Sequence, residues 1–285
     1  MLPSLGKRLI SATFIVAFVL AAFFWFPSWA MVLTVAVISA VALIEFYGFL
    51  SAVGIPAFKG LGVVAGLALQ AVTWYAYAGT GSLPAAEWEL LVILALVFLT
   101  LIRCFYRKNS DKLILTMAGT LLGFFYVPFL LNFIVKLLMA GGIDSGRFLV
   151  LYLLLVVKWS DAGAYFVGCG CGRHKMIPRI SPGKTWEGLA GGLGAGLLVS
   201  LLVYFIGGIR AGTVDFTLFD AITIGLLITA AGVCGDLVES LFKRSVGVKD
   251  SSSVIRGMGG ILDVLDSLLF AAPVLYVCVR FLFAA

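Results

Sequence analysis

Long apolar runs separated by short polar stretches extend along almost the whole chain. Each run has about 20 residues, the length that an α-helix needs to cross the hydrocarbon layer of a membrane. Nine runs are expected to be helices, at residues 9–26, 29–50, 61–79, 88–106, 114–138, 148–168, 187–209, 219–241 and 261–283. Because lipid offers no hydrogen-bond partners to an exposed backbone, we predict an all-α, polytopic integral membrane protein.

The composition supports this prediction and argues against a soluble domain, a nucleic-acid-binding protein and a zinc site. Hydrophobic residues make up 62% of the 285 residues and charged residues 12%, which is unlike any ordinary soluble domain. The net charge of +6 does not indicate a nucleic-acid partner, because its placement along the loops matters more than its sum. The five cysteines and the single histidine, His174, lack the spacing of a zinc site. We therefore expect a lipid bilayer, and no nucleic acid, around this chain.

The polar loops between the predicted helices alternate in charge. Fifteen of the 20 Lys and Arg residues fall into one set of alternating loops, whereas the loop with Glu87 and Glu89 has none. By the positive-inside rule the N-terminus is cytoplasmic and the C-terminus lies outside, which predicts a multi-pass protein of the cell inner (cytoplasmic) membrane. The first run follows Lys7 and Arg8 as in a signal peptide. No cleavage site of small residues closes that run, so a retained helix is expected.

Charged residues are sparse in the first half of the chain and dense in the second. We expect one integral membrane domain, 1–285, in which residues 1–150 form scaffolding helices and residues 151–285 form the catalytic half. In the first half, Glu45 is expected to snorkel to the interface rather than to serve a site. Asn132 is expected to form a hydrogen bond between helices.

The stretch 235–267 combines dense charge with apolar flanks. It holds five carboxylates and four cations, namely Asp236, Glu239, Asp250, Asp263, Asp266, Lys243, Arg244, Lys249 and Arg256. Charge at membrane depth is costly, so such a cluster is by default a hypothesis for a functional site. On the predicted topology this polar site faces the cytoplasm.

The spacing within this stretch indicates a metal and phosphate site. Carboxylates and hydroxyls recur at i, i+3 and i+4 on two helix ends, at Asp236, Glu239 and Ser240 and again at Asp263, Asp266 and Ser267. Mg²⁺ prefers oxygen ligands, usually one or two carboxylates together with substrate phosphates. The loop between the two ends contains Gly247, Gly257, Gly259 and Gly260, and glycine backbone can approach a phosphate closely.

Two further motifs precede this stretch. Lys158 and Asp161 lie at i, i+3 on one helix face, so Lys158 is expected to pair and Asp161 to face the site. The segment SPGKTWEG, residues 181–188, is not a Walker A motif, because Pro178 stands where that motif needs glycine. We interpret the segment as a basic turn before a helix that Ser181 or Thr185 caps. Lys184 then offers an anion site, with a solvated positive-inside loop as an equal alternative.

Residues 240–267 resemble the sequence signature of a known family. The segment SLFKRSVGVKDSSSVIRGMGGILDVLDS resembles the signature of the CDP-diacylglycerol synthases, or phosphatidate cytidylyltransferases, in outline S-x-x-K-R-x(4)-K-D-x(5)-P-G-H-G-G-x-L-D-R-x-D. The segments SDAGAY, SPGKTWEG and GDLVES are also similar to this family, so that the resemblance covers residues 158–267. Three positions depart from the signature: Arg256 replaces proline, Met258 replaces histidine and Val264 replaces arginine.

The resemblance implies a reaction and roles for individual residues. The reaction is CTP plus phosphatidic acid giving CDP-diacylglycerol plus pyrophosphate, and a homodimer is left open. Mg²⁺, with a second cation left open, is implied at Asp236, Glu239, Asp263 and Asp266, of which Glu239 is a second choice. Catalytic contacts are implied at Lys243, Arg244, Lys249 and Asp250. Substrate binding is implied at Asp161, Ser181, Lys184, Thr185, Ser240, Gly257, Gly259 and Gly260.

Two alternatives belong to other classes. A secondary transporter with an intramembrane ion site would show internal repeats and broken helices, but the two halves show no corresponding repeat. A polyprenol or phytol kinase-like lipid phosphotransferase would share the need for nucleotide and Mg²⁺. It would activate an alcohol, however, and that chemistry calls for a base.

Overall fold

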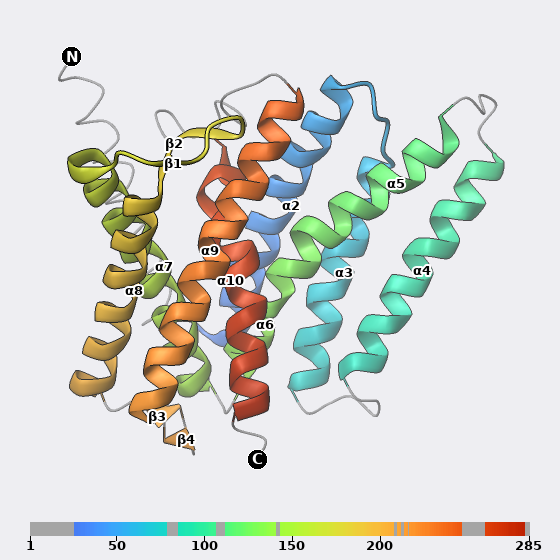
Figure 1. The fold of residues 1–285 in the computed structure, drawn as a ribbon. Helices are drawn as coiled ribbons and strands as arrows, with labels where there is room; N and C mark the ends of the chain where they lie inside the picture. Colours follow the sequence, from blue (N-terminus) through green and yellow to red (C-terminus); the bar gives the residue numbers. More distant parts are fainter. Residues whose placement is uncertain are drawn as a thin grey trace. The chain divides into compact units, whose positions relative to one another are not determined.

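The computed structural model describes residues 26–78, 85–106, 112–140, 143–207, 210–211, 214–215, 217–246 and 260–282. Helices account for nearly all of these residues (Figure 1): α2 (Ser28–Ala52), α3 (Lys59–Tyr77), α4 (Ala85–Phe105), α5 (Leu113–Phe124), α6 (Leu130–Met139), α7 (Ile143–Cys171), α8 (Trp186–Gly207), α9 (Leu218–Val246) and α10 (Ile261–Leu282). A π-helical turn, η1 (Phe125–Phe129), joins α5 to α6. Two short hairpins are built from β1 (Lys175–Ile177), β2 (Ser181–Thr185), β3 (Arg210–Ala211) and β4 (Val214–Asp215).

The helices confirm the predicted fold class. Among the described residues, eight helical stretches are long and apolar enough to cross a membrane, and they coincide with eight of the nine predicted spans. The remaining predicted span, 9–26, lies outside the described residues apart from Phe26. One stretch, Leu113–Met139, contains Pro128 within η1. Proline cannot donate a backbone hydrogen bond, and the wider π-turn accommodates it without ending the span.

The chain divides into two compact units, which are described separately. Unit 1 comprises Met1–Lys136 and Ser245–Val264, and unit 2 comprises Leu137–Arg244 and Leu265–Ala285. The expectation of one membrane domain with halves meeting at residue 150 stays a prediction.

A buried tyrosine organises the packing of α2, α3 and α5 in unit 1. The Tyr47 hydroxyl donates a hydrogen bond to the Thr120 carbonyl oxygen at 2.9 Å. A Cβ at Gly62 or at Gly123 would collide with the Tyr47 ring. Glycine at both positions therefore lets these helices close around the ring.

A buried polar cluster joins α3, α4 and α6 in the same unit. Lys136 Nζ lies 2.6 Å from Glu89 Oε2, and Asn132 Nδ2 donates to Thr73 Oγ1 at 2.9 Å and to Glu89 Oε1 at 3.2 Å. The interhelical hydrogen bond predicted for Asn132 is confirmed. The expectation that Glu89 belongs with the loop charges is wrong, because Glu89 lies inside α4 and is only 7% exposed.

Small residues bring α7 and α8 together in unit 2. A Cβ at Gly163 on α7 would meet the Cβ of Ala195 and the carbonyl oxygen of Gly191 on α8. The missing side chain at Gly163 therefore allows the two helices to pack closely at this point. The connection between the two helices was expected to be a turn, but it contains an antiparallel hairpin in which Lys175 lies opposite Thr185.

The Glu89–Lys136 pair yields a stability prediction. Lys136→Met leaves the Glu89 carboxylate buried without its cation, so we expect the free energy of unfolding to fall by about 3 kcal/mol. Thermal unfolding in detergent measures the change. The double variant Glu89→Gln/Lys136→Met is expected to regain part of the loss, whereas Lys59→Met, at the exposed start of α3, should melt like the unaltered protein. An unchanged melting temperature for Lys136→Met would contradict the structural role of the pair.

Candidate functional site

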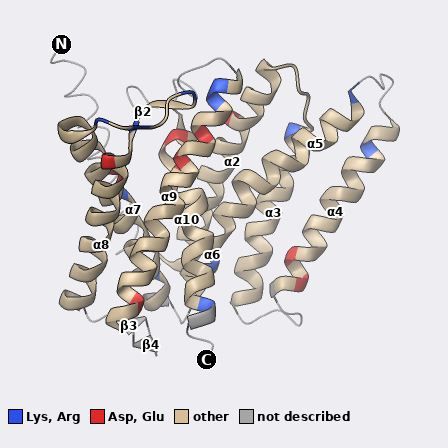
Figure 2. Ribbon diagram, viewed as in Figure 1, with Lys and Arg blue, Asp and Glu red and all other residues tan. Residues whose placement is uncertain are grey.

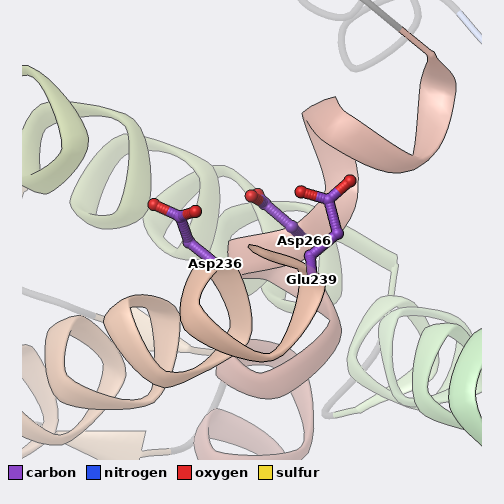
Figure 3. Close-up of side chains that lie close together, drawn as sticks. All are labelled: Asp236, Glu239 and Asp266. Carbon is purple, nitrogen blue, oxygen red and sulfur yellow. The ribbon is translucent and has the colours of Figure 1, made fainter. Parts of the chain in front are cut away.

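Three carboxylates converge where α9 meets α10 in unit 2. Asp236, Glu239 and Asp266 each offer one oxygen, and these atoms all lie within 4.8 Å of one another (Figure 3). Glu239 is 1% exposed and Asp266 is 8% exposed, whereas Asp236 is partly accessible. The i, i+3 spacing on α9 thus places two acids on one face, as predicted from the sequence.

A glycine contact explains how α10 reaches this face of α9. A Cβ at Gly235 would collide with the carbonyl oxygen of Asp266, so only glycine permits this separation of the two backbones. Gly232, one turn earlier, faces Ser267 at ordinary contact distance. The residue before Asp236 therefore sets the distance between the two helices that carry the acids.

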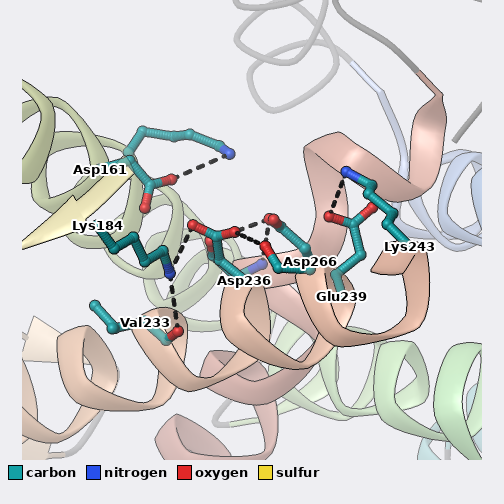
Figure 4. Close-up of polar contacts among 10 residues, drawn as sticks. Asp161, Lys184, Val233, Asp236, Glu239, Lys243 and Asp266 are labelled. Atoms are coloured by element: carbon teal, nitrogen blue, oxygen red, sulfur yellow. Dashed lines mark hydrogen bonds and ion pairs between the residues drawn. The ribbon is translucent and has the colours of Figure 1, made fainter. Parts of the chain in front are cut away.

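Two lysines compensate part of the negative charge (Figure 4). Lys184 Nζ lies 2.8 Å from Asp236 Oδ2 and donates to the Val233 carbonyl oxygen at 3.3 Å, while Lys243 Nζ lies 2.9 Å from Glu239 Oε2. Asp266 forms no ion pair with a described lysine or arginine. Counted over the described residues alone, these three carboxylates and two ammonium groups leave one net negative charge, which favours the entry of a cation.

Hydroxyl groups complete the polar surroundings of the acids. Ser240 Oγ lies 3.4 Å from Asp236 Oδ1, and Ser267 Oγ donates to Asp266 Oδ1 at 3.1 Å. On α7, Lys158 Nζ lies 3.7 Å from Asp161 Oδ2, so the predicted pair is confirmed. Figure 4 shows the Asp161 side chain beside Lys184 and Asp236. The cluster thus combines residues from α7, α9, α10 and the β1–β2 hairpin.

The donor set suits a divalent cation of the magnesium type. All three converging ligands are carboxylate oxygens, the ligand type that Mg²⁺ prefers, and phosphate oxygens of a substrate commonly complete its coordination. The uncompensated negative charge and the low exposure of two of the acids point the same way. Asp236, Glu239 and Asp266 are therefore suited to hold the ion.

Hydrogen bonds from the first turn of α8 fix the hairpin that carries Lys184. Thr185 Oγ1 accepts the Gly188 N–H at 3.1 Å, so the predicted cap at Thr185 is confirmed. The alternative cap at Ser181 is wrong, because that residue begins β2. Glu187 accepts the backbone N–H groups of Arg173 at 3.1 Å and His174 at 3.2 Å, and it lies 2.6 Å from His174 Nδ1. Sequence reasoning assigned no role to Glu187.

The hairpin is also attached to the end of α9. Arg244 Nε donates to the Ile180 carbonyl oxygen at 3.1 Å. Arg244 and Lys243 are adjacent, yet Arg244 is exposed and contacts the hairpin, whereas Lys243 turns to the carboxylates. The two predicted phosphate-contacting cations thus occupy different surroundings.

The start of α10 belongs to unit 1 and is bonded to two further acids, Asp263 on α10 itself and Glu45 on α2. Asp263 is not among the three converging acids; its Oδ2 accepts the Gly260 N–H at 2.9 Å. Glu45 Oε1 accepts the Ile261 N–H at 3.2 Å and Glu45 Oε2 accepts the Leu262 N–H at 3.0 Å. The expectation that Glu45 snorkels is wrong, because its carboxylate is buried against the N-terminus of α10.

Part of the predicted site lies outside the described residues. This applies to the predicted catalytic residues Lys249 and Asp250, to the predicted substrate-binding residues Gly257 and Gly259, and to two departures from the signature, Arg256 and Met258. Their assignments stay predictions.

Comparisons with known proteins complete the description of the site. A family model described as "Cytidylyltransferase family" matches residues 6–282. The phosphatidate cytidylyltransferase of Haemophilus influenzae is 45% identical over 129 residues, which cover 45% of this chain and 44% of that protein. The phosphatidate cytidylyltransferase of Staphylococcus aureus (strain COL) is 44% identical over 135 residues, which cover 46% and 49% of the two chains.

The name of a further relative states no activity. The uncharacterized protein YnbB of Escherichia coli (strain K12) is 39% identical over 168 residues, covering 58% of this chain and 54% of that protein. The chain therefore spans about half the length of the curated relatives that it matches.

The converging acids yield a binding prediction. Asp266→Asn removes one anionic ligand with little change of volume, so the dissociation constant for Mn²⁺, a spectroscopic substitute for Mg²⁺, should rise about tenfold or more. Electron paramagnetic resonance of free Mn²⁺ measures the constant. Asp220→Asn is the matched control, because Asp220 lies at the other end of α9 and its Oδ2 accepts the Thr217 N–H at 2.9 Å. Equal Mn²⁺ binding by both variants and the unaltered protein would exclude a metal site at these acids.

Proposed function

This chain belongs to the cytidylyltransferase family, and we propose that it transfers the cytidylyl group of CTP to phosphatidic acid, giving CDP-diacylglycerol and pyrophosphate. The observation that carries the proposal is the convergence of Asp236, Glu239 and Asp266 next to Lys184 and Lys243. A metal–triphosphate complex needs this combination of anionic ligands and nearby cations. The surrounding apolar helices would keep a lipid substrate at the same depth.

The proposed reaction asks for positioning and charge neutralisation rather than for a strong base. An oxygen of the lipid phosphate attacks the α-phosphorus of CTP, and the bond from that phosphorus to the oxygen of the β-phosphate breaks. The nucleophile is already an anion, so no proton has to be removed from it. Catalysis therefore rests on holding the two anionic substrates together and stabilising the charge that moves to pyrophosphate.

The acids would hold Mg²⁺, and the metal when bound supplies positive charge to the triphosphate. The ligands that the geometry favours are Asp236, Glu239 and Asp266. Asp263, one turn before Asp266 on α10, stays a predicted ligand. A second cation stays a prediction as well.

The cations would bind the phosphates themselves. Lys184 and Lys243 lie within 2.9 Å of carboxylates of the cluster, so both ammonium groups would be available to the phosphate oxygens of a substrate held beside these acids. Arg244 and Lys249 are proposed to take part, with Asp161, Ser240 and Gly260 as further substrate contacts. The predicted homodimer stays a prediction.

Two other functions are less favoured. A kinase-like lipid phosphotransferase needs a base for an alcohol, and the only histidine, His174, is exposed and bonded to Glu187. The Haemophilus influenzae and Staphylococcus aureus relatives are phosphatidate cytidylyltransferases, which does not favour an ion-coupled transporter. Cytidylyl transfer is the function that the relatives with named activities favour.

Orientation in the membrane is part of the proposal. Within unit 1, basic residues lie at the end of α4 that holds Arg103, whereas Glu87 lies at the other end (Figure 2). This charge asymmetry supports a multi-pass protein of the inner membrane whose N-terminus and active site face the cytoplasm. CTP and Mg²⁺ are available on that side.

The first test is an activity measurement with purified protein. Labelled CTP and phosphatidic acid should give CDP-diacylglycerol and pyrophosphate in a Mg²⁺-dependent reaction. Diacylglycerol, polyprenol or phytol offered with a nucleoside triphosphate should give no phosphorylated lipid. Absence of CDP-diacylglycerol, together with formation of a lipid phosphate, would replace the proposed function by the kinase-like one.

Asp263 provides the sharper test of the metal assignment. Asp263→Asn keeps an oxygen that can accept the Gly260 N–H, so the melting temperature should change little. If Asp263 is a metal ligand, kcat should fall about 10²-fold, which is about 2.7 kcal/mol of barrier, and high Mg²⁺ should restore part of the rate. A well-folded Asp263→Asn protein with nearly normal CTP turnover would remove Asp263 from the metal site. Asp220→Asn is again the control.

Cysteine labelling tests the topology. In a variant whose five native cysteines are replaced, Glu87→Cys should react with an impermeant maleimide added outside the cell. Lys175→Cys should react only after the cytoplasmic face is opened, because its loop belongs to the basic set. If both positions label from the same side, the nine-span topology is wrong.

A further inference from the structure

The N-terminus of α10 is held by a residue that lies far away in the sequence. The first N–H groups of a helix have no partner within the helix, and at membrane depth water is scarce to bind them. Glu45, on α2 and 216 positions before Ile261, accepts the first of these groups with one carboxylate oxygen and the Leu262 N–H with the other. Glu45 is only 9% exposed, so this contact replaces solvent almost completely.

The contact fixes more than one degree of freedom of α10. Two carboxylate oxygens bonded to two successive N–H groups restrict both the translation of the first turn along the helix axis and its rotation about that axis. A single hydrogen bond would not do this. Asp263 Oδ2 closes the same turn on Gly260 at 2.9 Å. A carboxylate at a helix N-terminus is also favoured by the helix dipole.

The next residues along this helix are the predicted metal ligands. Asp263 lies on the turn that Glu45 holds, and Asp266 follows one turn later on the same continuous helix. A metal site tolerates displacements of only about 0.5 Å in its ligands. A shift or rotation of the first turn of α10 would therefore be transmitted to both carboxylates.

From these contacts we infer that Glu45 is a positioning residue for the metal-binding end of α10. It acts through Ile261 and Leu262 on Asp263 and Asp266, and it does not itself bind substrate. The inference rests on the proposed function, because it takes these two acids to be the ligands of the metal that carries CTP. A residue of the sparsely charged first half, Glu45, would thus position two acids of the second half, Asp263 and Asp266.

The test compares two buried glutamates of unit 1. Glu45→Gln removes the charge and one of the two acceptor oxygens at the start of α10. Glu89→Gln is the matched control: Glu89 is buried to a similar degree, at 7% exposed, but its described partners Thr73, Asn132 and Lys136 lie on α3 and α6. A purely structural role of Glu45 would make the two variants behave alike.

Amide exchange and the two metal constants separate positioning from folding. In Glu45→Gln the amides of the peptide 260–270 should exchange with deuterium about tenfold faster, because a buried bond to a charged acceptor is lost. The Mg²⁺ concentration for half-maximal CTP turnover and the dissociation constant for Mn²⁺ should each rise about fivefold or more, while KM for phosphatidic acid stays unchanged. Glu89→Gln should lower the melting temperature and leave all three quantities as in the unaltered protein.

A second variant removes the same bond from the other side. Ile261→Pro deletes the N–H that Glu45 Oε1 accepts, at the first helical position, where proline is well tolerated. It should raise the Mn²⁺ dissociation constant as Glu45→Gln does, and the double variant should lose less than the combined losses of the two single variants. This arm remains informative if Glu45→Gln does not fold.

The outcomes distinguish the inference from the function on which it rests. If Glu45→Gln and Ile261→Pro bind Mn²⁺ like the unaltered protein, Glu45 only holds helices together and the inference is wrong. If the unaltered protein makes no CDP-diacylglycerol, the proposed function fails. Mn²⁺ binding and amide exchange then still decide whether Glu45 positions the acids.

Discussion

The structure around the site has to balance the mutual repulsion of three carboxylates, Asp236, Glu239 and Asp266. Three carboxylate oxygens within 4.8 Å of one another, two of them on nearly inaccessible side chains, would oppose folding if nothing balanced them. Lys243 lies on α9, the helix that also carries Asp236 and Glu239, whereas Lys184 lies on the separate β1–β2 hairpin. Hydrogen bonds of Thr185, Glu187 and Arg244 hold that hairpin in place. They therefore contribute to the charge balance, because they keep Lys184 next to Asp236.

The same balance suits the proposed chemistry. A site that fully neutralised its acids would bind a metal poorly, and a site without lysines would repel the phosphates that the metal carries. In the part of the chain that the structure describes, three carboxylates next to two ammonium groups lie between these limits. Partial neutralisation is thus a compromise between folding, which favours full charge balance, and the proposed metal binding, which needs a remaining negative charge.

The sequence predicted those features that depend on local spacing. The spans, the shared face of Asp236 and Glu239 and the cap at Thr185 all follow from periodicity and helix-end chemistry. The approach of Asp266 depends on the absence of a side chain at Gly235, and the burial of Glu45 depends on a contact with a helix 216 positions away. No pattern within one segment encodes either contact. The hairpin escaped prediction because SPGKT shows neither alternation nor β-branched residues in series.

The buried Glu89–Lys136 pair has a consequence for the order of events during synthesis. The two residues are 47 positions apart, so Glu89 is synthesised before the lysine on α6. At roughly 5 to 20 residues per second, the carboxylate waits a few seconds for its cation. Until α6 arrives, Thr73 and Glu89 lack the partners that connect α3 and α4 to α6. Final packing of these helices is thus a late step of biogenesis, set by the time at which one charged side chain enters the membrane.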